Sequence, residues 1–112
     1  PEDIADAPEI QAATAQLDLA KQAESAGPLD ELRSAVEADE NNHQARFDYA
    51  VALNAADNAE EAVNQLLELF RRDREWNDGA AKTQLFTVFE ALKANDPVVL
   101  NGRRKLSSMI FA

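Results

Sequence analysis

Few residues of this 112-residue chain are of types that could carry out chemistry. It contains one His and no Cys, which excludes thiolate nucleophiles, disulfides, iron–sulfur clusters and His-rich metal sites from this polypeptide. His43 follows Asn41 and Asn42 at a predicted helix start, so an exposed or capping role is expected for it rather than that of a general base. Glu60 and Glu61 lie in a predicted first helical turn, where negative charge stabilises the helix dipole. The sequence therefore predicts no catalytic residues and no enzyme activity for this chain.

The segment 73–84 resembles a calcium-binding loop only in part. Its glycine, Gly79, falls one place late, and the twelfth position is Gln84 rather than a bidentate glutamate. We predict no metal site and no cofactor. Trp76, just before Asn77, is expected to act as a hydrophobic staple on the first turn of the following helix, near Ala81.

The charge of the chain is unevenly distributed. The formal net charge is −10, and residues 1–61 hold 3 basic and 15 acidic side chains, whereas residues 62–112 hold 8 and 6. A large negative charge repels phosphate backbones and anionic lipid headgroups, so we predict binding to neither nucleic acid nor membrane surfaces. The longest apolar runs are far shorter than the roughly 18 residues of a membrane span. Proteins or peptides are the expected partners.

The composition and the start signals predict an all-α fold. Pro8, Pro28 and Pro97 each precede a stretch of helically spaced apolar residues, and proline suits a first helical turn. Asn41 or Asn42, Asn58 and Asp96 each place a side-chain oxygen at a predicted helix start, and Asn58 with Glu61 three residues later matches a capping box. Six antiparallel helices are expected, at about residues 8–25, 28–39, 42–56, 59–75, 78–94 and 97–111.

Apolar residues also recur every 34 positions. Leu17, Val51 and Leu85 form one such series, and a second consists of Leu32, Leu66 and Leu100. This period in paired helices is typical of tetratricopeptide repeats, in which stacked hairpins share one core. We predict a tetratricopeptide-like right-handed solenoid over residues 8–112, with hairpins at about 8–39, 42–75 and 78–111. A generic six-helix bundle is the alternative.

Two surfaces are candidates for binding a partner. The first helix of each hairpin should line a concave groove, which we expect to include Gln44, Phe47, Val51, Asn54, Ala81, Leu85, Val88 and Phe89. The alternative is that these side chains form the core between repeats. The last helix is the second candidate, because its end carries both basic and large apolar residues: Arg103, Arg104, Leu106, Met109, Ile110 and Phe111. Packing of that end on its own solenoid, on a second copy or on another protein is expected.

Three segments carry a resemblance to a known family. They are the Trp-Asn-Asp-Gly-Ala-Ala block at 76–81, within Phe70 to Leu92, the Asp96-Pro97 pair, and Arg103-Arg104-Lys105-Leu106 through Phe111. Over about residues 8–112 the sequence resembles the C-terminal helical region of YbbN/CnoX-type proteins, which are thioredoxin-like proteins with a tetratricopeptide extension. The resemblance implies a thioredoxin-like domain before Pro1, with residues 1–7 as linker.

The same resemblance implies a function. YbbN/CnoX-type proteins act in the bacterial cytoplasm as holdases or redox-linked co-chaperones that contact GroEL- and DnaK-type chaperones and unfolded clients. None of the residues in the three matching segments is a redox residue. The expected role is a non-catalytic interaction domain, and the alternative is a structural or dimerisation module that forms a homodimer or braces a thioredoxin-fold oxidoreductase.

Overall fold

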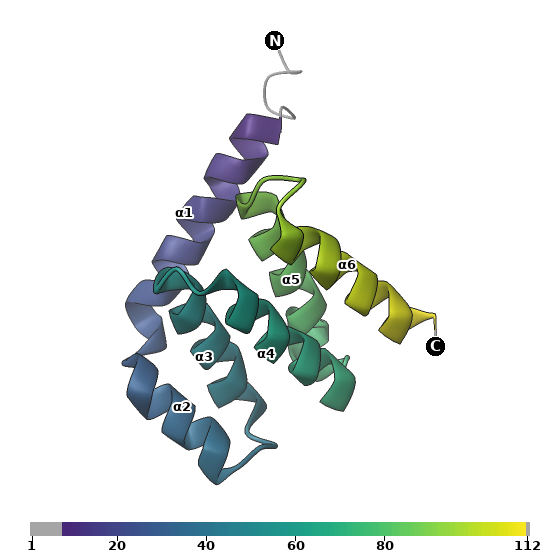
Figure 1. The fold of residues 1–112 in the computed structure, drawn as a ribbon. Coiled ribbons are helices and arrows are strands. Elements are labelled where there is room, and N and C mark those ends of the chain that lie inside the picture. Colours follow the sequence, from purple (N-terminus) through teal and green to yellow (C-terminus); the bar gives the residue numbers. More distant parts are fainter. Residues whose placement is uncertain (1–7, 112) are drawn as a thin grey trace.

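The computed structural model describes residues 8–111, and the side chains of residues 11–111. The linker expected at residues 1–7 lies outside this range. The described residues form six α-helices and one short 3-10 turn, without a strand (Figure 1). The elements are α1 (Pro8–Ala26), α2 (Leu29–Ala38), α3 (His43–Ala55), α4 (Ala59–Arg72), η2 (Trp76–Asp78), α5 (Ala80–Ala91) and α6 (Pro97–Ile110). The all-α prediction is confirmed, and the helix bounds agree with it to within a few residues.

Side-chain caps begin three of the helices. The side chain of Asn42 accepts a hydrogen bond from the Ala45 N–H, and that of Asn58 accepts one from the Glu61 N–H. Asp96 accepts from the Val98 N–H over 2.8 Å, directly before Pro97. Each cap satisfies a backbone donor that the first helical turn leaves unpaired. The polar residues at the starts of α3, α4 and α6 therefore act as caps. The second half of the capping box expected at α4 does not form, because the Asn58 N–H donates to the Leu53 carbonyl and the Glu61 carboxylate accepts from Asn64 and Gln65.

The Asn42 cap leads to a first prediction. Asn42→Ala should lower the free energy of unfolding by about 1 kcal/mol, because the Ala45 N–H loses its acceptor. Asn42→Asp keeps an acceptor at this place and should stay close to the native chain. Urea unfolding followed by circular dichroism measures both. Equal losses in the two variants would contradict a capping role.

The α3–α4 hairpin is the centre of the fold. α3 packs along α4 and also against α2, while α4 also contacts α5 and α6. The larger buried cluster joins Ala50 of α3 to the apolar faces of α4, α5 and α6, and includes Leu66, Leu85 and Val99. A smaller one, around Val36, Ala45, Tyr49, Leu53 and Ala62, holds α2 on this hairpin. The apolar side of each helix thus packs against a neighbouring helix, as a core shared between repeats requires.

The first helix departs from the expected pairing. α1 packs against α3 and α5 rather than along α2. Gly27 has a φ of 99° and Pro28 is extended, so the two-residue connection leads α2 away from the end of α1 without folding it back (Figure 1). The faces of α3 and α5 are left for α1 to cover. The pairing expected at residues 8–39 is therefore replaced by contacts between distant parts of the chain.

The last helix rests mainly on α4. A Cβ added at Gly102 would lie 2.7 Å from a ring carbon of Phe89 and 3.2 Å from a methyl of Val63. The absence of a side chain at Gly102 therefore lets the backbone of α6 approach the core closely, with Phe89 of α5 filling the remaining space. The hairpin expected at 78–111 would place α6 along α5. In the structure α6 packs mainly on α4, so this expected pairing is wrong.

Candidate interaction surfaces

Most of the expected groove residues are core residues. Val51, Leu85, Val88 and Phe89 are buried, with Leu85 at 0% and Phe89 at 2% exposure, and Ala81 is buried as well. The prediction that these side chains line an open groove is wrong, and the alternative of a core between repeats is what the structure shows. The physical reason is that α3 and α5 are covered on one side by α4 and on another by α1.

The polar members of the predicted groove lie nearer the surface. Gln44 is exposed and donates a hydrogen bond to Asp48 over 3.0 Å, one turn along α3. Asn54 is partly exposed and lines a hollow described below. Phe47 is partly buried against the larger core cluster. The structure thus does not gather the predicted set into one accessible surface.

Amide side chains attach α1 to α5. Nε2 of Gln22 donates to Oε1 of Gln84 over 3.1 Å, and Nε2 of Gln84 donates back to Oε1 of Gln22 over 2.7 Å. Gln84 is buried, so this reciprocal pair satisfies amide groups that would otherwise be unpaired in the core. At the C-terminal end of α5, the Gln16 side chain donates a hydrogen bond to the Ala91 carbonyl over 3.0 Å. The sequence did not indicate that Gln84 would form this pair, because its partner Gln22 is 62 residues away.

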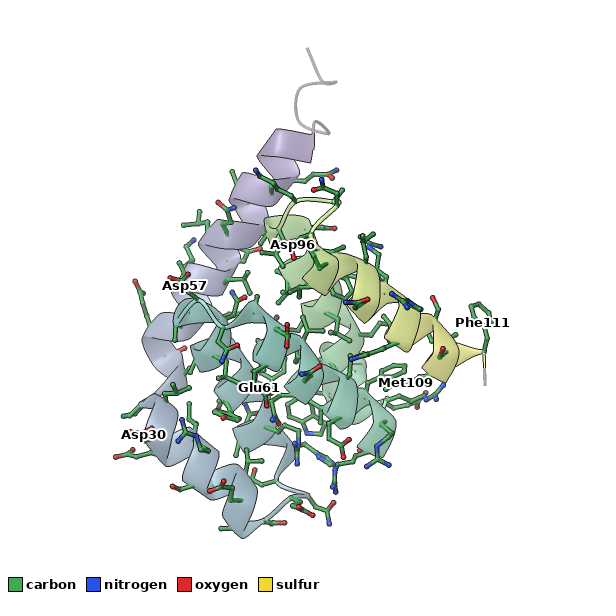
Figure 2. All side chains as sticks on the ribbon, in the orientation of Figure 1. Asp30, Asp57, Glu61, Asp96, Met109 and Phe111 are labelled. Carbon is green, nitrogen blue, oxygen red and sulfur yellow. The ribbon has the colours of Figure 1, made fainter. Side chains whose placement is uncertain are left out.

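Two hollows flank α1. The main hollow, of about 780 Å³, lies between α1, the end of α3, the start of α4, the end of α5 and the start of α6. It contains Leu19, Ala20 and Ala23 of α1 together with three acidic residues, Asp57, Glu60 and Asp96, and no basic side chain lines it among the described residues. Figure 2 labels Asp57 on the α3–α4 connection and Asp96 at the start of α6. The side hollow, of about 390 Å³, lies between α1, the end of α5 and Arg103.

The end of α6 is apolar and partly free. Leu106 is buried and Met109 is partly buried against the core, so part of the helix packs on its own repeat array as expected. Ile110 is 36% exposed and Phe111 is 85% exposed, and Phe111 points away from the body of the molecule (Figure 2). Ile110 and Phe111 are neighbours in the sequence, so the end of α6 presents two apolar side chains to solvent.

The basic side chains of α6 have intramolecular contacts. The Arg103 guanidinium lies 5.3 Å from the centre of the Phe89 ring, a cation–π distance. Arg104 is exposed and donates to Asn101 over 2.5 Å, within the same helix. Both keep their charges at the surface, where they can also meet an acidic partner.

Trp76 packs against two rings of α3. Its ring lies 5.7 Å from that of Phe47 and 6.3 Å edge-on from that of His43, both in α3. The rings that Trp76 contacts therefore belong to α3, whereas the sequence predicted a staple near Ala81. His43 was expected to be exposed or capping, but its side chain is only 20% exposed, with Nε2 3.9 Å from Asp73. The loop reverses after Trp76 because Asn77, Asp78 and Gly79 all have positive φ.

Arg46 is a buried cation that sequence reasoning missed. Its guanidinium donates to Oε1 of Gln65 over 2.7 Å and to the Glu40 carbonyl over 3.1 Å, which links α3 to α4 and to the α2–α3 connection. Burial, and next the charge of Arg72, lower the pKa of Arg46. A charged residue at a core position breaks the apolar pattern, so periodicity alone cannot find it.

Glu68 carries a strong ionic contact on α4. It accepts hydrogen bonds from Arg71 over 2.9 and 2.5 Å and from Arg72 over 2.6 Å. These bonds, those of Arg71 first, lower the pKa of the Glu68 carboxyl to about 2. Arg72 also reaches Asn41 and Glu40, so the cluster ties α4 to the α2–α3 connection.

This cluster predicts a pH dependence of stability. The folded-state pKa of Glu68 lies below its ordinary value of 4.5, so the stability it contributes is complete above that value and is lost as the pH falls towards 2. Glu68→Gln should therefore lower the free energy of unfolding at pH 7 by about 1 kcal/mol, as partly exposed pairs do. Denaturant unfolding at several pH values measures this. A difference between the two chains that was undiminished at pH 2, where about half of the Glu68 carboxyls of the folded chain are protonated, would contradict the assignment.

The described residues contain no group of three or more His, Cys, Asp or Glu side chains placed to hold a metal ion. Within the same range, none of the helices has the length and apolar character needed to cross a bilayer. Successive helices that pack on one another and share one core define an α-helical repeat protein.

The family comparison agrees with this class. A family model described as tetratricopeptide repeat matches residues 22–111, and the chain belongs to this family. Tetratricopeptide repeats mediate protein–protein interactions and are generally non-catalytic, so the chain is an interaction module. Comparison with curated proteins and with solved structures gave no match.

Proposed function

We propose that this interaction module belongs to a thioredoxin-like co-chaperone or holdase of bacterial protein quality control and acts in the cytoplasm. The proposal rests on the resemblance of residues 76–81 and 103–111 to YbbN/CnoX-type proteins, and on one structural observation. That observation is the free apolar end of α6, where Ile110 and Phe111 are exposed beside the basic residues Arg103 and Arg104. Chaperones of the GroEL and DnaK types and unfolded clients are the proposed partners.

Charge adds selectivity to this proposal. Residues 1–61 carry a net charge of −12, the difference between 3 basic and 15 acidic side chains. A field of this sign speeds the approach of basic clients and disfavours acidic ones, and its effect weakens with added salt. Affinity then comes from apolar contacts, whereas the acidic half decides which clients arrive.

Binding of purified GroEL and DnaK, measured by biolayer interferometry, tests the proposal. The native chain should bind at least one of them about tenfold more tightly than the double variant Ile110→Ser, Phe111→Ser, because truncating apolar anchors of an interface typically costs more than about 1 kcal/mol of binding free energy. Leu100→Ser is the matched control, since Leu100 lies in the same helix and is 53% exposed. No binding of the native chain to either chaperone, or an equal loss in the control, would contradict the proposal.

A dimerisation or bracing module is the second candidate. The same exposed Phe111 and Leu100 favour it, because a second copy could cover both side chains. Sedimentation of the chain, with and without an N-terminal thioredoxin-like domain, distinguishes the two candidates. A dimer that dissociates in the Ile110→Ser, Phe111→Ser variant would favour this second candidate.

A further inference from the structure

The main hollow and the end of α6 (residues 103–111) carry opposite charges. Three acidic side chains line the hollow, those of Asp57, Glu60 and Asp96, and no basic side chain lines it among the described residues. The basic side chains at positions 103–105 are all exposed, and residues 97–111 contain no Asp or Glu. Opposite charges on two surfaces favour their association and fix its orientation.

Both surfaces also contain apolar side chains. Leu19, Leu92 and Val98 line the hollow, and its volume of about 780 Å³ lies within the roughly 300–1,000 Å³ of sites that enclose small ligands. Ile110 and Phe111 are exposed at the end of α6. Insertion of these two side chains into such a hollow would remove apolar area from water on both surfaces.

The end of α6 cannot reach the hollow of its own chain. Asp96 and Val98 line the hollow at the start of α6, whereas Phe111 follows the last residue of this helix. A helix of 14 residues is about 20 Å long, so α6 itself holds the two surfaces apart (Figure 2). A second copy of the chain is therefore an occupant that brings both the opposite charge and the apolar side chains.

The charges also decide how two copies would meet. Contact between two α6 ends about a two-fold axis would bring Arg103, Arg104 and Lys105 of one copy towards the same residues of the other. Like charges placed in this way oppose binding. A head-to-tail contact instead places the basic end of one copy at the acidic hollow of the next.

We propose that this chain associates head to tail, with Ile110 and Phe111 of one copy in the main hollow of the next and Arg104 beside the acidic side chains there. The hollow of the first copy and the α6 end of the second stay free, so further copies can add. Two exposed apolar side chains form a small contact, and the net charge of −10 opposes the approach of whole chains. The association is therefore weak and depends on concentration.

This contact goes beyond the proposed function and affects it. Ile110 and Phe111 are also the proposed anchors for chaperones, and they cannot contact a chaperone while they lie in a hollow. Association therefore lowers the apparent affinity for chaperones by the fraction of chains whose α6 end is occupied. This consequence rests on the proposed function, whereas the contact itself does not.

Two variants, each of which blocks one side of the contact, test the inference. The end variant is Ile110→Ser, Phe111→Ser, and the hollow variant is Ala20→Arg, Glu60→Lys, which changes two exposed side chains that line the hollow. In sedimentation velocity the average mass of the native chain should rise with concentration, and each variant alone should associate at least about tenfold more weakly. An equimolar mixture of the two variants should form a dimer and nothing larger, because it contains one kind of intact hollow and one kind of intact end.

Matched controls make the same types of change elsewhere. Leu100→Ser removes an exposed apolar side chain from the same helix. Ala13→Arg, Glu31→Lys changes the net charge as the hollow variant does, at exposed positions outside the hollow. Both controls should associate as tightly as the native chain. Circular dichroism of every variant checks that the helix content is unchanged.

Nuclear magnetic resonance locates the contact. The unlabelled hollow variant is added to the isotope-labelled end variant, whose hollow is intact. The amide signals of Asn54, Asp57, Glu60 and Leu92 should shift, because these residues line the hollow, while those of α2 should stay in place. Shifts that leave the residues of the hollow unchanged would contradict the assignment of this surface.

Three results would overturn the inference. The first is a dissociation constant above about 1 mM for self-association of the native chain. The second is a mixture of the two variants that stays monomeric. The third is a hollow variant that associates as tightly as the native chain, which is the result expected of a two-fold contact between α6 ends.

The two proposals can fail separately. Chaperone binding that depends on Ile110 and Phe111, in a chain that does not associate with itself, leaves the proposed function in place and rejects the head-to-tail contact. Head-to-tail association of a chain that binds neither GroEL nor DnaK supports the contact and rejects the chaperone assignment.

Discussion

Replacing Phe89 by alanine is expected to lower the free energy of unfolding by about 3–5 kcal/mol. The ring is 2% exposed, belongs to the larger core cluster and supports the close approach of α6 at Gly102. Its removal loses the transfer free energy of the ring and leaves a cavity that two helices cannot close without moving. Guanidinium unfolding followed by circular dichroism measures the loss, which is a large share of the stability of a domain this size.

Phe86→Ala is the matched control for this prediction. Phe86 lies in the same helix and its ring is 6.3 Å from that of Phe89, but it is 36% exposed. Its truncation should cost clearly less, because part of the ring is already in water. A cost for Phe89→Ala as small as that for Phe86→Ala would mean that Phe89 faces an open groove, as the sequence suggested.

Gly102→Ala should lower the free energy of unfolding by about 1–3 kcal/mol, although alanine is the better helix former. The added Cβ would lie 2.7 and 2.8 Å from two ring carbons of Phe89, and 3.2 Å from Val63. Phe89 is buried on all sides, so its ring cannot turn away without disturbing the core. Thermal or chemical unfolding of the variant measures the effect.

A double-mutant cycle isolates the cause of that loss. Leucine at position 89 lacks the outer ring carbons that the new methyl would meet, so the cost of Gly102→Ala should shrink in the Phe89→Leu background. It should even turn into a gain of up to about 1 kcal/mol, the difference in helix propensity between the two residues. An unchanged cost in this background would show that crowding with Phe89 is not the reason for the glycine.

Local features of this fold could be read from the sequence. Asn42, Asn58 and Asp96 each carry a side-chain acceptor before an apolar-periodic stretch, and all three cap the helices expected there. The 34-residue period indicated a shared core, and the family match confirms the repeats. These signals work because they depend on residues only a few positions apart, or on a repetition of the same pattern.

Features that depend on distant residues could not be read in this way. Periodicity showed which faces of α3 and α5 are apolar, but not that α1 would cover them, so Val51 and Leu85 were assigned to a groove. The pairing of Gln22 with Gln84 and the burial of Arg46 also depend on partners in other helices. The packing on its own solenoid that was one expectation for the end of α6 holds for Leu106 and Met109 but not for Phe111, which is 85% exposed.

The contact between α1 and α5 also affects how the chain can fold during synthesis. α1 is translated before the other helices of the described chain, yet the glutamine that receives its amide lies 62 residues later. The α3–α4 hairpin can form from neighbouring segments, and α1 can then contact α3, but its contacts with α5 become possible only after α5 has been synthesised. The full set of contacts that α1 makes is therefore completed only after α5 has been synthesised, although α1 precedes the other described helices in the sequence.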